Sequence, residues 1–258
     1  MTKVEVFPNA AALNNEAAEQ IARRAQEAVR RNGHCSIVLS GGSTPRALYS
    51  LLATEYGEQI PWAACHFFWG DERSVPPDHP ESNYRMAMEA ILSRVPVPAE
   101  NIHRVRAEDP DAQRAAEQYA DEIRAFFGTV SGQFPSFDIV LLGLGPDGHT
   151  ASLFPGTAAL QEKEKLVVTN WVEKFGAFRI TMSAPLLNHA ACVLFLVQGA
   201  EKAEAVCSVL HGAYQPEKHP AQLIRPANGQ LLWMVDEAAG KLCRVGGDLV
   251  RNCRSLLR

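Results

Sequence analysis

The chain is organised around residues 137–156, which read FDIVLLGLGPDGHTASLFPG. Residues 139–142 are apolar without a break, as in a strand that is buried on both faces of a parallel sheet. A glycine-rich turn and then His149 follow, and histidine is the side chain whose ordinary pKa lies nearest neutrality. Open α/β sheets place their chemistry just beyond the carboxyl ends of such strands. We therefore expect the centre of a sheet here, with His149 as a candidate base.

This turn allows two other interpretations. GLGPDG fits the pattern G-x-G-x-x-G of dinucleotide sites, but Pro146 lies inside the turn and Pro155 follows before a helix can form. No obvious acidic residue ends a strand about twenty residues further on, where such sites hold the ribose. The context therefore disfavours a dinucleotide, whereas a structural turn with an incidental histidine stays open.

The composition is that of an ordinary globular protein. The 258 residues are 47% hydrophobic and 21% charged, so we expect one domain spanning residues 1–258. A formal net charge of -4 argues against nucleic acid or an acidic membrane as a partner. No apolar run approaches the roughly 18 residues of a membrane span, and the first residues lack the pattern of a secretion signal. The sequence does not indicate an oligomeric state.

The 6 cysteines are widely scattered and show no spacing typical of metal ligands. We therefore expect reduced thiols in a cytoplasmic protein, with neither a disulfide framework nor a metal site.

Strands and helices alternate along the chain. Residues 3–7 resemble an edge strand, and apolar residues then recur every four positions from Leu13 to Val29, as on one face of a helix. Buried strands are predicted at residues 36–39, 66–69, 139–142, 191–197 and 231–235, with a further strand near 165–169. This alternation predicts an α/β protein with a doubly wound, mostly parallel open sheet and helices on both faces.

The strand at 36–39 runs into SGGSTP, residues 40–45, at the start of an apolar helix pattern. We expect Pro45 as the first helical residue, with Ser43 or Thr44 as the cap. The free N–H groups of such a helix start, together with Gly42 and the two hydroxyls, make a cradle for a phosphate. A capped turn without a ligand is equally compatible with this motif.

Charged residues follow other strands. The strand at 66–69 runs into Asp71 and Arg73, which belong either to a functional site or to a solvated loop. Lys202 lies in the first turn of the helix expected after the strand at 191–197, where the helix dipole disfavours a cation unless an anion is nearby. A solvated lysine remains the alternative for Lys202. Arg179 begins a further element.

In a doubly wound sheet such strand ends converge on one cleft. They would bring together hydroxyls, basic side chains and His149, without a set of metal ligands. The patterns G-x-S-x-G and H-E-x-x-H and the Walker lysine motif are absent from the sequence. The residues therefore predict a site for a small phosphorylated molecule with one histidine base.

Five segments resemble the glucosamine-6-phosphate isomerase/6-phosphogluconolactonase family, and they are LSGGSTP (39–45), FFWGDERSVPPDHPESNY (67–84), LLGLGPDGHTASLFPG (141–156), RIT (179–181) and GAEKA (199–203). The likeness covers most of the chain in order. It implies hydrolysis of 6-phosphoglucono-δ-lactone to 6-phosphogluconate in the oxidative pentose phosphate pathway. It also implies a sheet wound on both sides, a sugar-phosphate substrate and no required cofactor.

The lactonases and deaminases of this family differ in their residues. The segment after D-G-H in the deaminases resembles I-A-F-N-E-P-G, whose glutamate assists the histidine, whereas residues 150–156 here read TASLFPG without a carboxylate. Arg73 stands where the deaminases tend to carry an aromatic residue. Asp71, their proton shuttle, is retained, so its role here is open. The resemblance therefore favours the lactonase, with a deaminase or a non-catalytic sugar-phosphate sensor as alternatives.

Lactone hydrolysis needs a water made nucleophilic and a donor for the oxyanion that forms at the carbonyl. We expect His149 to be the general base, while Asp147 either orients its imidazole or only closes the turn. Arg73 would steady the oxyanion or the sugar hydroxyls.

The phosphate would lie on the amides and hydroxyls of Gly42, Ser43 and Thr44. Arg179 and Lys202 would supply charge, because arginine suits bidentate contact with a phosphate and lysine acts as a point charge.

Overall fold

The computed structural model describes residues 2–245 and 248–249. Within these residues six strands form the main sheet, and every neighbouring pair in it is parallel. In spatial order they are β1 (Thr2–Phe7), β9 (Gln230–Asp236), β8 (Cys192–Val197), β5 (Ile139–Leu142), β2 (Cys35–Leu39) and β3 (Cys65–Trp69). The predicted parallel sheet is confirmed, and β1 is an edge strand as expected.

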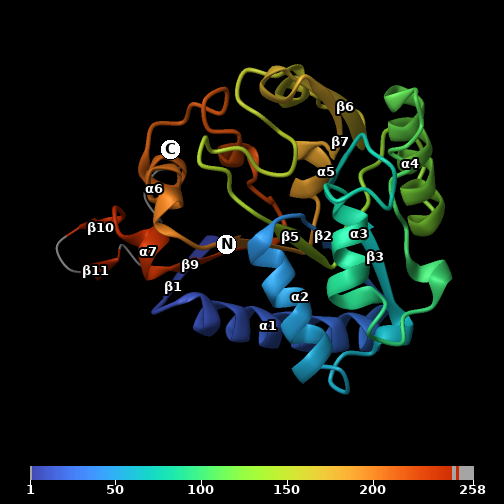
Figure 1. Cartoon of the computed structure of the whole chain (residues 1–258), viewed down its shortest axis with the longest axis horizontal. Helices are drawn as coiled ribbons and strands as arrows, with labels where there is room; N and C mark the ends of the chain where they lie inside the picture. The colour runs from blue at the N-terminus through green and yellow to red at the C-terminus, as the bar shows by residue number, and fades with distance from the viewer. Residues whose placement is uncertain (1, 246–247, 250–258) are drawn as a thin grey trace.

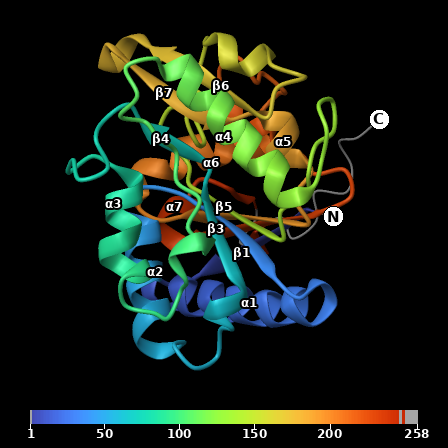
Figure 2. The same cartoon turned by 90° about the vertical axis from the view of Figure 1, so that its right-hand side faces the viewer.

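Helices lie on both sides of this sheet, with α1 and α2 below it and α4 and α5 above it in both views (Figures 1 and 2). The helices are α1 (Ala10–Asn32), α2 (Ser43–Glu55), α3 (Asn83–Ala87), α4 (Ala112–Phe127), α5 (Ala184–Asn188), α6 (Ala203–His211) and α7 (Glu237–Gly240), and a π-helical turn η2 (Met88–Leu92) continues α3. Short 3-10 turns are η1 (Trp62–Ala64), η3 (Ala99–Asn101), η4 (Ala158–Gln161), η5 (Glu173–Phe175), η6 (Ala200–Lys202) and η7 (Pro220–Leu223).

A second, antiparallel sheet lies above the main one and contains β4 (Asp71–Arg73), β7 (Ala177–Met182) and β6 (Val167–Val172). Arg179, which was expected to begin a further element at the converging strand ends, lies instead within β7 of this small sheet. The small sheet is fastened to the large one by the N–H of Met182, which donates to the carbonyl oxygen of Gly70 at 2.8 Å. Two short strands, β10 (Arg244–Val245) and β11 (Asp248–Leu249), pair separately. Cys253 lies outside the described residues.

The chain changes direction across the sheet between β2 and β5. From β2 it moves outward to β3 at the edge, and it later returns to place β5 on the other side of β2. The segments that follow β2 and β5 therefore leave toward opposite faces, which opens a crevice between them at the carboxyl ends of the strands. The loops at residues 40–44 and 143–149 both border this point.

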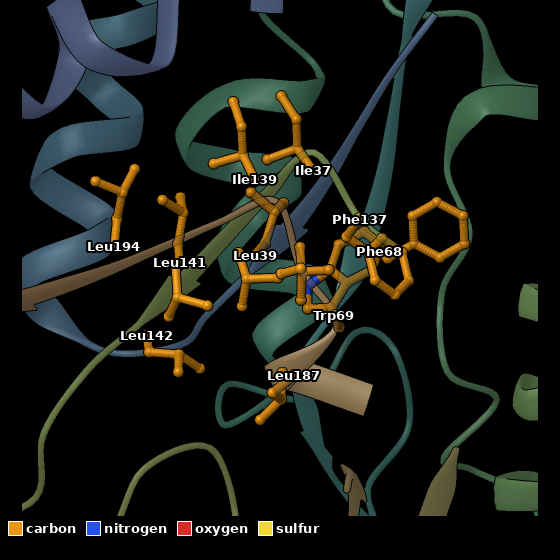
Figure 3. Close-up of a cluster of buried hydrophobic side chains, with 14 of the residues drawn as sticks. Ile37, Leu39, Phe68, Trp69, Phe137, Ile139, Leu141, Leu142, Leu187 and Leu194 are labelled. Atoms are coloured by element: carbon orange, nitrogen blue, oxygen red, sulfur yellow. The ribbon is translucent and has the colours of Figure 1, made fainter. Parts of the chain in front are cut away.

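The core is formed by strands whose residues are buried on both faces. All residues of β2, β5 and β8 are buried, which explains why their sequences are continuous apolar runs rather than alternating ones. Figure 3 shows the centre of this core, where Ile37, Ile139 and Leu194 from three adjacent strands point into one cluster. This cluster holds the strand ends, and hence the loops after them, in fixed positions.

Three histidines meet near the amino end of β3, opposite the edge that carries the crevice. The Nδ1 atom of His66 lies 3.1 Å from Nε2 of His103, whose Nδ1 lies 2.9 Å from a carboxylate oxygen of Glu122. The ring of His34 is 6.0 Å from that of His66. Burial, followed by the positive charges of His103 and His34, lowers the pKa of His66 from its ordinary 6.5 to about 4.

We predict that His66 makes the fold sensitive to acid. Its pKa is lower in the folded chain than in the unfolded one, so the unfolded chain binds more protons between pH 6.5 and about 4. The free energy of unfolding should fall as the pH drops through this window. The steepest slope corresponds to about one extra proton bound by the unfolded chain. Urea unfolding at several pH values should show a shallower fall for His66→Gln, whereas His211→Gln should follow the wild type. Equal slopes for the wild type and His66→Gln would contradict the prediction.

Candidate functional site

The turn after β5 presents His149 at the crevice. Gly148 has φ of 80°, a left-handed conformation that favours glycine. The turn closes with two backbone hydrogen bonds, from the N–H of Gly145 to the His149 carbonyl at 2.8 Å and from the N–H of Gly148 to the Gly145 carbonyl at 3.0 Å. No helix follows directly, since the next element is η4, so the dinucleotide interpretation lacks the helix start it requires.

Within this turn Asp147 and His149 form a short hydrogen bond of 2.5 Å between Oδ1 and Nδ1. Burial by itself raises the pKa of the Asp147 carboxyl, but the hydrogen bond and charge of His149, together with backbone N–H groups, outweigh burial and lower that pKa to about 2. The ionised carboxylate can only accept a hydrogen bond, so Nδ1 of the imidazole donates to it, and in the neutral form of the ring Nε2 is the acceptor nitrogen. Asp147 thus orients His149 and does more than close the turn.

Phe154 fixes the plane of the imidazole. Its ring stacks on that of His149, with centroids 4.1 Å apart and an angle of 27° between the rings. A Cβ atom at Gly145 would overlap Nδ1 of His149 and lie 2.7 Å from Oδ1 of Asp147, so only glycine fits there. The histidine is therefore held by a carboxylate, a stacked ring and the glycine backbone.

Asp71 is linked to the same turn. Its Oδ2 atom accepts a hydrogen bond of 2.6 Å from the hydroxyl of Ser152, three residues after His149. Between His149 and Ser152 in the sequence, Ala151 has φ of 47°, a conformation that costs a non-glycine residue on the order of 1–3 kcal/mol. The hydroxyl of Thr150 donates to the Gly143 carbonyl at 2.8 Å. These hydrogen bonds hold the strained residue in place and keep the Asp71 carboxylate next to the histidine turn.

Asn83 connects Asp71 with the loop after β2. Its amide donates to the Asp71 carbonyl at 2.9 Å, and a Cβ atom at Gly41 would overlap that same amide. The sequence analysis did not single out Asn83, because nothing in the local pattern shows that it meets residues 12 and 42 positions away.

Glu72 is a buried carboxylate with a structural role. Its exposed fraction is 2%, and it accepts hydrogen bonds from the backbone N–H groups of Arg73, Asn83 and Tyr84 and from the hydroxyl of Ser82. Burial raises the pKa of Glu72, and these N–H groups oppose that effect. Because side chains alternate along a strand, Glu72 faces away from Asp71 and Arg73, which explains why its neighbours reach the site and it does not.

Two arginines lie side by side across the small sheet. Arg73 on β4 is the register partner of Arg179 on β7. The Nη1 atom of Arg73 donates to the carbonyl of Glu81 at 2.7 Å. Burial, followed by the positive charge of Arg73, lowers the pKa of Arg179. Like charges that face each other across strands repel, so this pair favours a bound anion.

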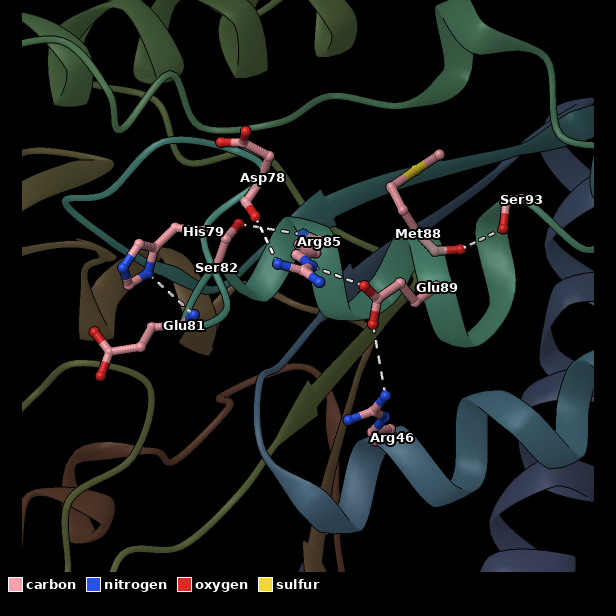
Figure 4. A network of polar contacts seen from close by, with 9 residues as sticks. All are labelled: Arg46, Asp78, His79, Glu81, Ser82, Arg85, Met88, Glu89 and Ser93. Carbon is pink, nitrogen blue, oxygen red and sulfur yellow. Dashed lines mark hydrogen bonds and ion pairs between the residues drawn. The ribbon is translucent and has the colours of Figure 1, made fainter.

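The loop that supplies the Glu81 carbonyl is braced from α3 (Figure 4). Arg85 donates from Nη1 to the Asp78 carbonyl at 2.7 Å and from Nε to Glu89 at 2.7 Å. Glu89 also lies 3.5 Å from Arg46 on α2. These contacts tie residues 78–82 to both helices.

The expected phosphate cradle is an exposed helix start. The helix α2 begins at Ser43 with Gly42 as its N-cap and no capping side chain, so the expectation that Pro45 is the first helical residue is wrong. Gly42 has φ of 110°, a backbone conformation that favours glycine, and the helix begins at the next residue, Ser43. Gly42 and Ser43 are exposed and Thr44 is half-buried, and their backbone N–H groups face outward at the positive end of the helix dipole.

Lys202 ends η6 and is the N-cap of α6, just before the first turn in which it was expected. It follows β8, which lies on the side of β5 opposite β2. Among the described residues no carboxylate forms an ion pair with Lys202. The carboxyl edge of the sheet thus carries, in order, Lys202, the histidine turn, the start of α2 and Asp71.

Two hollows of about 440 and 460 Å³ lie elsewhere, against α4. Both are lined by Arg104, Arg106 and Glu122, and neither touches His149 or Arg179. The residues of the candidate site come from the loops and strands at the carboxyl edge of the main sheet and line neither hollow. No group of three or more potential metal ligands occurs among the described residues. No helix within them is long and apolar enough to cross a membrane.

These features define a doubly wound α/β protein that carries a histidine and basic side chains at the carboxyl edge of its main sheet, where the strand order reverses. A family described as glucosamine-6-phosphate isomerases/6-phosphogluconolactonase matches residues 8–233. The chain is 44% identical to a 6-phosphogluconolactonase of Nostoc sp. over 237 residues, which cover 92% of this chain and 96% of that one. It is 42% identical to a 6-phosphogluconolactonase of Synechocystis sp. over 242 residues, covering 94% and 98%.

Solved structures are similar too. That of 6-phosphogluconolactonase from Trypanosoma cruzi superposes with a TM-score of 0.82 at 32% identity, covering 93% of this chain and 96% of that one. The chain belongs to the glucosamine-6-phosphate isomerase/6-phosphogluconolactonase family.

We predict that Gly145→Ala breaks the hydrogen bond between Asp147 and His149, because the new Cβ atom occupies the space of the imidazole. In NMR spectra the strongly downfield proton on Nδ1, assigned by its loss in His149→Gln, should disappear. Gly143→Ala is the matched control, since its Cβ atom would meet nothing within 4 Å. Retention of the resonance in Gly145→Ala would contradict the prediction.

Proposed function

We propose that this chain hydrolyses 6-phosphoglucono-δ-lactone to 6-phosphogluconate, with His149 as the general base. Membership of the family and the relatives named 6-phosphogluconolactonase support the reaction. The observation that carries the mechanism is the oriented pair of Asp147 and His149 beside the carboxyl ends of β2 and β5. A free Nε2 atom at this position can accept a proton from water.

The proposed hydrolysis begins with the activation of water. Nε2 of His149 removes a proton from water while the water oxygen bonds to the lactone carbonyl carbon, and the carbonyl oxygen becomes an oxyanion. The ring C–O bond breaks next, and the imidazolium returns the proton to the departing ring oxygen. The carboxylate of Asp147 stabilises the imidazolium in between, as a carboxylate does beside other catalytic histidines. The new carboxyl group finally loses its proton to solvent.

We assign the phosphate to the start of α2, where the N–H groups and hydroxyls of Ser43 and Thr44 adjoin Gly42. Arg179 and Lys202 would add charge. Arg73, already held by the Glu81 carbonyl, would donate to the oxyanion or to sugar hydroxyls. Asp71 would accept from a sugar hydroxyl, since Ser152 occupies only one of its oxygens at short distance.

The deaminase alternative gains no support from the site. Residues 150–156 contain no carboxylate, and Phe154 occupies the face of His149 instead. A solved glucosamine-6-phosphate deaminase has a TM-score of 0.78 but only 21% identity, a likeness that extends to the fold alone.

We also propose that residues 1–258 form one domain and that the protein is cytoplasmic. The family match over residues 8–233 and one continuous cluster of buried apolar side chains support a single domain. The described cysteines are free thiols, as in a reducing compartment.

The test is a coupled assay with freshly made lactone, in which 6-phosphogluconate dehydrogenase reports product as NADPH. Turnover above the spontaneous rate supports the proposal, and release of ammonia from glucosamine 6-phosphate would support the deaminase instead. Binding of 6-phosphogluconate without turnover of either substrate would favour the sensor.

We predict that His149→Ala lowers kcat by about 10² to 10⁴, the usual contribution of positioned proton transfer. The control is His211→Ala, on α6, which should keep the wild-type rate. Thermal unfolding should show that both variants fold. Wild-type turnover in His149→Ala would remove this residue from the mechanism.

A further inference from the structure

A large aromatic side chain is exposed next to the candidate site. Phe175 lies in η5, at the turn between β6 and β7, and its exposed fraction is 47%. Because a single exposed apolar side chain is common, only the contacts of this ring can indicate a role for it.

The ring of Phe175 contacts both Phe154 and Arg179. It meets the ring of Phe154 edge-on, with centroids 5.7 Å apart and an angle of 75°. Phe154 in turn stacks on His149. On the other side the guanidinium of Arg179 lies 4.9 Å from the centroid of the Phe175 ring, and the ammonium of Lys174 lies at 5.6 Å. A continuous row of contacts therefore links the histidine to the arginine.

The contact with the Phe175 ring stands in place of an ion pair at Arg179. Arg179 faces the like charge of Arg73, and among the described residues no carboxylate forms an ion pair with it. Among the described residues the acceptor for its guanidinium is the carbonyl of Phe178, at 3.3 Å. An aromatic face attracts a guanidinium without cancelling its charge, so the arginine stays available to an anion. A carboxylate in the same place would compete with the substrate phosphate.

We propose that Phe175 is a positioning residue that holds Arg179 in the orientation that binds the substrate phosphate. The inference rests on the proposed function. The ring of Phe154 contacts Phe175, and the face of Phe175 in turn contacts the guanidinium. Because the phosphate takes no part in the bonds that form and break, the effect falls on binding and not on the chemical step.

Phe175→Leu tests this, since leucine keeps the bulk and removes the aromatic face. The coupled assay should give a KM about three- to tenfold higher with kcat within about twofold of wild type, as expected for one lost cation contact. Calorimetry should show the same weakening for 6-phosphogluconate. Phe175→Tyr should restore both values.

Phe178→Leu is the matched control. Phe178 is 44% exposed on the same hairpin, but it follows the alternation of β7 away from Arg179, and its ring meets Trp171 at 5.0 Å. This variant keeps the backbone carbonyl that accepts from Arg179 and should match the wild type.

The decisive comparison uses Arg179→Ala. Adding Phe175→Leu to this background should change KM no further, because the group that Phe175 holds is gone. An unchanged KM in Phe175→Leu, a loss confined to kcat, or full additivity with Arg179→Ala would overturn the inference. If the wild-type protein binds 6-phosphogluconate but does not hydrolyse the lactone, the proposed reaction is refuted and the inference on Phe175 is not. Calorimetry with 6-phosphogluconate on the same variants would then test Phe175.

Discussion

The hydrogen bond between Asp147 and His149 is the constraint on which the site depends. It exists because a glycine at 148 turns the chain into a left-handed conformation and a glycine at 145 leaves room for the imidazole. The Asp147 carboxyl, whose pKa is lowered to about 2, is ionised near neutral pH. A fixed anion at Nδ1 leaves Nε2 as the nitrogen that would accept a proton in the proposed reaction.

The rest of the fold brings partners to that nitrogen. The reversal of strand order between β2 and β5 places the start of α2 beside the histidine turn. The small antiparallel sheet adds what the main sheet lacks, since β4 and β7 carry Arg73 and Arg179 as neighbours. Hydrogen bonds of Glu72 and Asn83 connect β4 to the start of α3. The chemistry thus belongs to loops, while two sheets and buried polar contacts fix their geometry.

Much of this could be predicted from the sequence because it is encoded locally. Buried strands appear as apolar runs, and the glycine-rich turn marks the end of a strand and makes His149 a candidate base. The position of Arg179 could not be predicted, because its strand pairs with residues about a hundred positions earlier. Pro45 was misplaced because the left-handed Gly42 starts the helix two residues early. Asn83 was missed because Asp71 and Gly41 are near it only in space, and Phe175 because nothing local shows that Phe154 meets its ring.

The most direct test of this account is a double-mutant cycle on the oriented pair. The kcat of the lactonase reaction would be measured for Asp147→Ala, His149→Ala and the double variant. If Asp147 acts through His149, the double variant should be no slower than His149→Ala alone, because residues that act as a unit are strongly non-additive. Losses that multiply would show that the carboxylate works independently of the histidine, and the central claim would fail.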